Sequence, residues 1–150
     1  MAPLSHTLLP GHANVFVFGT LKAGFALHER GLAAATFDGC WRTIMPYPML
    51  VAGPWYAPMM FDEPGVGQRV SGELYEVDRR ALAVLDALES IGVPGNDRIF
   101  IEIERLDGEE RCVAFVYVKS RAFATPAHTG YLADYQDRRF VLPELRACSP

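Results

Sequence analysis

The chain has 150 residues, of which 50% are hydrophobic and 21% are charged, and its formal net charge at pH 7 is −4. This length and composition predict a single globular domain over residues 1–150. The acidic balance and the scattered basic residues argue against a nucleic-acid partner, because phosphate binding requires a basic face.

The chain has no apolar run near the roughly 18 residues needed to cross a bilayer, so no membrane partner is expected. The first dozen residues lack Lys and Arg and do not resemble a signal peptide. Cys40, Cys112 and Cys148 are far apart, and their odd number gives no complete disulfide framework. Free thiols in a reducing cytoplasm are therefore expected.

The first half of the chain predicts two strands and a short helix. After a loose leader over residues 1–13, Val15–Phe18 is an apolar strand and Ala26–Ala33 a short helix. Thr36–Ile44 is a second strand. Pro46–Leu50 is expected to be a turn, because each proline fixes φ and lacks a backbone donor.

The second half predicts three strands and one longer helix. Arg69–Val77 alternates with the period of a strand, and Asp78 is a suitable N-cap for a helix over Arg79–Ser90. Arg98–Leu106 and Arg111–Val118 form a hairpin around a DGEE turn. Residues 120–150 form an irregular tail. The expected fold class is α+β, with a small, mixed, largely antiparallel and barrel-like sheet and few helices.

Glu89 is out of place on the predicted helix. At about 100° per residue it falls between Leu82 and Leu85, inside the apolar stripe. Burial and the negative end of the helix dipole both disfavour a charged carboxylate, so its pKa is expected to rise. A carboxyl with a raised pKa suits proton transfer at neutral pH. The alternative is that the helix frays and Glu89 points into water.

The segment Phe18-Gly19-Thr20-Leu21 ends the first strand in a flexible loop. Such a loop can turn its backbone N–H groups outward, toward an anionic group. It lacks the spacing of a phosphate-binding P-loop, since Lys22 precedes Gly24. The four histidines also lack ligand spacing on one element, so no metal is expected.

Three segments, VFVFGTLKAG, VSGELYEVDRRALAVLDALES and CVAFVYV, occur in an order and spacing that resembles the γ-glutamylcyclotransferase superfamily. PYPMLVAG and PGVGQRVSGELY are similar to its γ-glutamylamine cyclotransferase and AIG2-like branch. The resemblance covers about Asn14 to Val118. It implies a compact mixed barrel-like fold that needs no cofactor.

The resemblance also implies an enzyme with a lyase- or acyltransferase-type cyclisation. The α-amine of a γ-glutamyl group attacks its own γ-carbonyl, which releases 5-oxoproline and a free amine or amino acid. The family's catalytic glutamate falls on Glu89, and its substrate-binding loop falls on Phe18, Gly19, Thr20 and Leu21, with Phe18 in place of the usual Tyr.

Four further residues follow from the resemblance or from their position. Tyr117 matches a family tyrosine near the site, where its hydroxyl would orient substrate, and half-buried packing is the alternative. Tyr75 is expected to be structural and Lys22 to be exposed. His28 is expected to cap or brace the short helix.

Alternatives remain at this point. The chain is either a γ-glutamyl cyclotransferase, a pathway-specific enzyme that removes a γ-glutamyl protecting group, or a non-catalytic small-molecule-binding domain of the same fold. The segment from residue 90 to Arg98 departs from the family pattern and is expected to border the leaving group. The tail aromatics either line a pocket or pack on the barrel.

Overall fold

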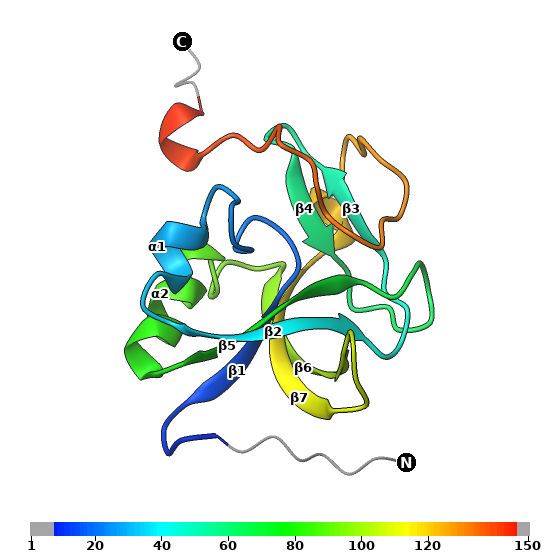
Figure 1. Ribbon diagram of the computed structural model, residues 1–150. Coiled ribbons are helices and arrows are strands. Elements are labelled where there is room, and N and C mark those ends of the chain that lie inside the picture. Colours follow the sequence, from blue (N-terminus) through cyan, green and yellow to red (C-terminus); the bar gives the residue numbers. More distant parts are fainter. Residues whose placement is uncertain (1–7, 147–150) are drawn as a thin grey trace.

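A computed structural model describes residues 8–146, and five of its strands close into a barrel. The order around the barrel is β1 (Ala13–Val17), β5 (Ser71–Val77), β2 (Thr36–Thr43), β6 (Asn96–Arg105) and β7 (Arg111–Lys119) (Figure 1). Four of the pairings are antiparallel, and the parallel contact of β1 with β7 closes the ring. The predicted mixed, largely antiparallel barrel is confirmed.

The alternation read from the sequence decides which side chains fill the barrel. Ile101 and Ile103 are buried, whereas Glu102 between them faces solvent. The barrel interior is otherwise filled by large side chains from several strands, among them Phe16, Trp41, Leu74 and Val116. These side chains pack the interior of the barrel, and Phe16 of the same cluster also lines the cavity described below.

A hairpin of β3 (Met49–Ala52) and β4 (Ala57–Met60) forms a second, two-stranded sheet. The prediction of a turn over Pro46–Leu50 is therefore wrong at its end, because Met49 and Leu50 belong to β3. Pro48 lies just before the strand. Pro58 is tolerated inside β4 because a two-stranded sheet leaves each strand with one unpaired edge.

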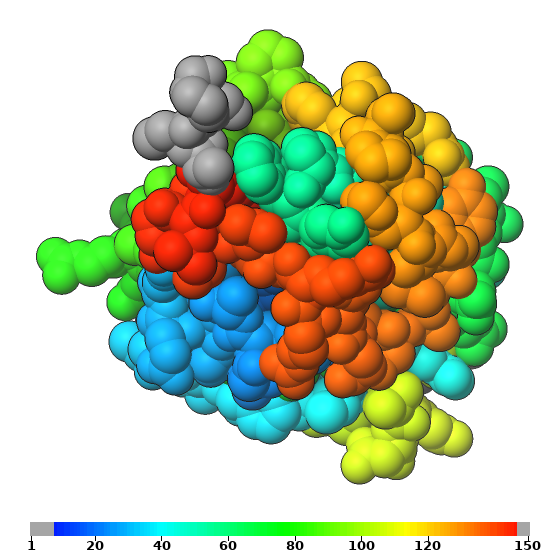
Figure 2. All heavy atoms as spheres, turned by 90° about the horizontal axis from the view of Figure 1, so that it is seen from above, coloured from blue at the N-terminus to red at the C-terminus, as the bar shows by residue number. Residues whose placement is uncertain are grey.

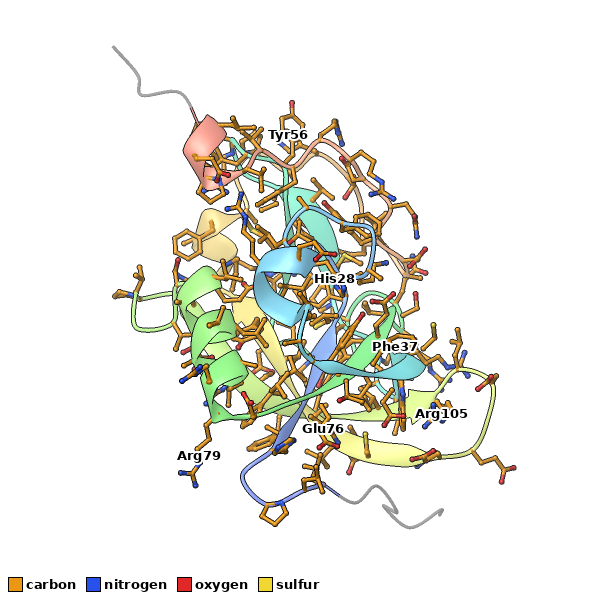
Figure 3. All side chains as sticks on the ribbon, turned by 60° about the vertical axis from the view of Figure 1, so that its left-hand side comes forward. His28, Phe37, Tyr56, Glu76, Arg79 and Arg105 are labelled. Carbon is orange, nitrogen blue, oxygen red and sulfur yellow. The ribbon has the colours of Figure 1, made fainter. Side chains whose placement is uncertain are left out.

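Two helices pack together beside the barrel. The helix α1 (His28–Leu32) is shorter than predicted, and α2 (Arg79–Leu88) begins where Asp78 accepts a hydrogen bond from the Ala81 amide at 2.8 Å. A Cβ on Gly31 would lie 2.7 Å from Leu85, so the helices touch closely. Figure 3 shows Arg79 projecting into solvent at the start of α2 and Tyr56 at the opposite end of the molecule.

The remaining regular structure lies in the tail, as the 3-10 turns η1 (Arg121–Phe123) and η2 (Pro143–Leu145). Much of the predicted leader and the end of the tail, with Cys148, lie outside the described residues. Cys40 and Cys112 are free thiols. Within residues 8–146, no helix is long and apolar enough to cross a membrane.

Candidate active site

A cavity of about 710 Å³ lies between the end of β1, the β3–β4 hairpin, the end of α2 and the C-terminal segment. It brings together every residue that the sequence placed in the site: Phe18, Gly19, Thr20, Leu21, Glu89 and Tyr117. Most of its other lining is apolar, from Leu27, Trp55, Pro58, Leu88, Phe123 and Phe140 among others. An apolar cavity with a few polar groups is the usual form of a small-molecule site.

The side chain of Lys22 anchors the loop after β1 to the C-terminal part of the chain. Its ammonium donates to the Tyr135 carbonyl at 2.9 Å and to Asp134 at 3.1 Å, and the residue is only 5% exposed. The prediction of an exposed Lys22 is therefore wrong. A buried ammonium needs such partners, and these tie the loop to the C-terminal part of the chain, more than 100 residues away in sequence.

The hydrogen bonds of the loop leave its amides free. The carbonyls of Gly19 and Thr20 accept from the amides of Lys22 and Leu27, and the ring Nδ1 of His28 donates to the Leu21 carbonyl at 2.9 Å. His28 was expected to cap or brace the short helix; its side chain instead braces the loop, and α1 has no side-chain cap. Within residues 8–146, the amides of Gly19, Thr20 and Leu21 have no hydrogen-bond partner. These three residues line the cavity, and their unpaired amides are candidate donors to a ligand there.

Gly19 allows the loop to lie against the β3–β4 hairpin. A Cβ at this position would lie 2.5 Å from Cγ of Pro58, inside the proline ring's contact distance. No side chain fits here without moving one of the two segments. The glycine is therefore required by the close approach of the loop and β4, which form neighbouring walls of the cavity.

Glu89 is the C-cap of α2, and the helix ends in a closed turn. The amide of Ser90 donates to the Ala87 carbonyl, and the amide of Ile91 donates to the Asp86 carbonyl. This pair of bonds is the Schellman arrangement, with Ser90 at φ 55 in the position that glycine usually fills. The turn fixes the end of the helix, and the alternative of a frayed end with Glu89 in water is wrong.

The Glu89 carboxyl is sheltered in the cavity wall, with a side chain 18% exposed. Desolvation raises its pKa above the usual range, and the Lys119 ammonium opposes that rise only in part. The expectation of a carboxyl with a raised pKa, drawn from the helical wheel, thus agrees with the structure. Such a group exchanges protons more readily near neutral pH than an exposed glutamate does.

Lys119 is a cavity residue that the sequence reasoning missed. Its Nζ lies 3.8 Å from Oε2 of Glu89 and donates to Oδ1 of Asn96 at 2.9 Å. Asn96 and Lys119 face each other at the ends of β6 and β7, where the strands extend beyond their predicted limits. The signal was present, because Lys119 lies two residues after Tyr117 and therefore on the same face of the strand.

Tyr117 lines the cavity, but its hydroxyl proton is already engaged. It donates to Oδ1 of Asp86 at 2.8 Å, and Arg98 donates to both oxygens of the same carboxylate. Burial and this bond raise the Tyr117 pKa. The tyrosine therefore braces α2 against β7 one turn before Glu89. Tyr75 is structural as expected, since its hydroxyl donates to Glu73, which also accepts from the Ala23 amide.

The tail aromatics take both of the roles left open by the sequence. Phe123 and Phe140 line the cavity, whereas Tyr135 is fully buried in the core. The altered segment after Glu89 also reaches the site, because Ser90, Val93 and Asn96 line the cavity wall.

Comparison with known proteins places this geometry in a family. Residues 15–137 match the family model described as gamma-glutamyl cyclotransferase, AIG2-like. The chain belongs to this family. The family description and the names of curated relatives are those of a cyclotransferase family, so the enzyme class implied by the sequence is confirmed.

Two curated relatives carry the same kind of name. A gamma-glutamylaminecyclotransferase of Bos taurus is 38% identical over 131 residues, which is 84% of this chain and 77% of that protein. Gamma-glutamylaminecyclotransferase B of Danio rerio is 40% identical over 114 residues, which is 71% of this chain and 59% of that protein.

A solved structure of a family member supports the fold. The crystal structure of an AIG2-like protein from Mus musculus superposes with a TM-score of 0.72 at 32% identity, covering 83% of this chain and 88% of the mouse chain. The family match ends at residue 137, before Phe140, Pro143 and Arg146. One wall of the cavity in this chain therefore lies beyond the matched region.

Proposed function

We propose that this chain releases 5-oxoproline and a free amine from γ-glutamyl amides. The main support for this proposal is one observation. Glu89, with its sheltered carboxyl, lines the same cavity as Gly19, Thr20 and Leu21, whose amides are unpaired within the described residues. The names of the relatives favour a γ-glutamylamine as substrate. No cofactor is needed for the proposed step, because the substrate supplies its own nucleophile.

The proposed reaction is a transfer of the γ-acyl group within one molecule. A bond forms between the α-nitrogen and the γ-carbonyl carbon, and the bond from that carbon to the leaving nitrogen breaks. Over the reaction the α-ammonium loses two protons and the leaving nitrogen gains two. Glu89 is proposed to accept a proton from the attacking nitrogen and to return one to the leaving nitrogen.

The loop is proposed to bind the glutamyl part of the substrate. Backbone N–H groups at Gly19, Thr20 and Leu21 are suited to a carboxylate or to the oxyanion that develops on the γ-carbonyl. Because the attack is intramolecular, holding the glutamyl chain in a folded conformation supplies a large part of the rate enhancement. The bracing of the loop by Lys22 and His28 supports such preorganisation.

The proposed setting is the cytoplasm, with a small-molecule γ-glutamyl substrate and neither nucleic acid nor membrane as partner. The free thiols of Cys40 and Cys112 suit a reducing compartment. The acidic net charge of −4 gives no support to a phosphate-backbone partner.

The direct test is a panel of γ-glutamyl compounds, with released 5-oxoproline measured by chromatography. The panel contains γ-glutamyl-ε-lysine, other γ-glutamylamines and γ-glutamyl dipeptides. Release from the amines but not from the dipeptides is the result that we expect. A folded protein that binds these compounds but yields no 5-oxoproline from any of them would instead be a non-catalytic binding domain.

A further inference from the structure

The cavity has an excess of positive charge. Its charged lining residues are Glu89, Lys119 and Arg146. Lys119 faces Glu89 and donates to Asn96, so its charge is balanced inside the site. Within the described residues, Arg146 has no carboxylate within 4.0 Å.

Arg146 is held in place beside two aromatic rings. Its Nε donates to the Val141 carbonyl at 3.1 Å, and its guanidinium lies 5.4 Å from the ring centre of Trp55 and 5.6 Å from that of Phe140. Burial lowers its pKa, which reflects a guanidinium partly removed from water without an acidic neighbour. The two terminal nitrogens remain free for a ligand, since no bond from them to a described residue is recorded.

The segment that carries Arg146 is fastened across the cavity. The amide of Val141 donates to the Trp55 carbonyl at 3.0 Å, Arg138 donates to the Gly24 carbonyl at 2.6 Å, and Glu144 forms an ion pair with Arg30 of α1. Figure 2 shows the red and orange segment lying between the blue region after β1 and the green region around β3 and β4. This wall follows residue 137, where the family match ends.

We propose that Arg146 is a specificity-determining residue that binds a carboxylate on the leaving amine of the substrate. The inference rests on the proposed function, because it assigns one side of the cavity to the leaving group. A guanidinium with free terminal nitrogens binds a carboxylate through two parallel hydrogen bonds. Glu89 and the loop are assigned to the glutamyl part, which leaves the segment after Glu89 and the segment around Arg146 for the amine part. Among the described cavity residues on these two segments, Arg146 alone is a cation.

The test compares two substrates that differ only in that carboxylate. One is γ-glutamyl-ε-lysine, and the other is N-(γ-glutamyl)-1,5-diaminopentane, which has the same chain and the same free ammonium. For the unmodified protein we expect kcat/KM to be about tenfold or more higher for the lysine compound. Arg146→Met should abolish this preference, because kcat/KM should fall about tenfold more for the lysine compound than for the diaminopentane compound.

A matched control variant distinguishes the effect of the Arg146 guanidinium from the effect of moving the segment that carries it. Glu144→Gln weakens the tether to Arg30 outside the cavity and keeps Arg146, so the preference should persist. An equal loss in both variants would mean that the position of the segment matters and not the cation. That result would overturn the proposal, as would an unmodified protein that treats the two compounds alike.

Binding in a Glu89→Gln background gives a second readout that needs no turnover. Calorimetry should show tighter binding of γ-glutamyl-ε-lysine than of the diaminopentane compound, and Arg146→Met should remove the difference. If no variant produced 5-oxoproline but this difference were found, the proposed reaction would fail and the role of Arg146 would stand. Equal binding with and without the arginine would overturn that role.

Discussion

The ammonium of Lys119 lies 3.8 Å from the carboxyl of Glu89, inside the cavity formed at the end of β1 and α2. The two residues are 30 positions apart in the sequence. The β6–β7 ladder pairs Lys119 with Asn96, and the Lys119 ammonium reaches Glu89 at the end of α2. The carboxyl thus has two opposing influences. Burial favours its protonated form, and the lysine favours its ionised form.

Removing the lysine should shift the pH dependence of activity. Lys119 lowers the pKa of Glu89, so Lys119→Met should raise that pKa further. Since the base form must be present in the free enzyme, the acidic limb of the kcat/KM profile should move to higher pH. Lys119→Arg should restore most of the original profile.

The control for this profile is Arg80→Met, which removes one positive charge from the exposed face of α2. Its acidic limb should stay in place, because an exposed charge outside the cavity is screened by water. If the limb moved equally in Arg80→Met and Lys119→Met, a local influence of the lysine on Glu89 would be ruled out.

The free energy of unfolding should also depend on pH because the Glu89 carboxyl is buried. The folded-state pKa of Glu89 is raised, so its contribution to stability is present below the unfolded pKa of about 4.3 and is lost as pH rises through the folded value. Glu89→Gln removes this loss. The variant should therefore gain stability relative to the unmodified protein as the pH rises above the unfolded pKa of about 4.3.

Urea unfolding at several pH values measures this difference directly. The difference between the two proteins should be smallest near about pH 3, roughly one unit below the unfolded pKa, where the carboxyl is protonated in both states. Glu109→Gln, at an exposed turn position, is the matched control for the change of a glutamate to glutamine itself. A glutamine variant that is less stable at pH 8 than at pH 4, relative to the unmodified protein, would contradict the raised pKa.

Tyr117→Phe should affect stability more than chemistry. The hydroxyl donates to Asp86, and its loss should lower the free energy of unfolding by about 1–2 kcal/mol, because Arg98 still satisfies the carboxylate. Activity should fall much less than in Glu89→Gln. An unchanged unfolding curve together with a loss of turnover as large as that of Glu89→Gln would show that the hydroxyl acts on substrate instead.

Gly19→Ala should disturb the loop and β4 together. The added methyl would lie 2.5 Å from the Pro58 ring, so we expect destabilisation of about 1–3 kcal/mol and a higher KM. Gly130→Ala is the matched control, because nothing lies within 4 Å of its added methyl. Equal thermal unfolding and equal kinetics for the two variants would argue against the close contact at Gly19.

Local patterns in the sequence were sufficient to predict the barrel strands and to identify Glu89 as a candidate site residue. The alternation of Ile101, Glu102 and Ile103 identifies the buried face of β6, and the apolar stripe of α2 identifies the misplaced carboxyl. Both signals are periodic and need only neighbours in the chain. The binding loop was also singled out from its sequence, as a glycine-containing strand end, and the family resemblance added its substrate-binding role.

Contacts between residues far apart in the chain could not be predicted from these local patterns. Lys22 reads as an exposed loop lysine until Asp134 and the Tyr135 carbonyl are placed beneath it, more than 100 residues away. The hairpin of β3 and β4 was hidden by prolines at positions that a two-stranded sheet tolerates. Arg146 is unremarkable in sequence, and only the folding of the tail across the cavity brings it to the site.

The central claim is that Glu89 transfers the proton in the release of 5-oxoproline. The most direct measurement is the turnover of γ-glutamyl-ε-lysine by Glu89→Gln, with calorimetry of the same ligand to confirm that binding is retained. We predict a loss of about 10²–10⁴-fold in kcat with little change in affinity. Undiminished 5-oxoproline release from a folded glutamine variant would contradict it.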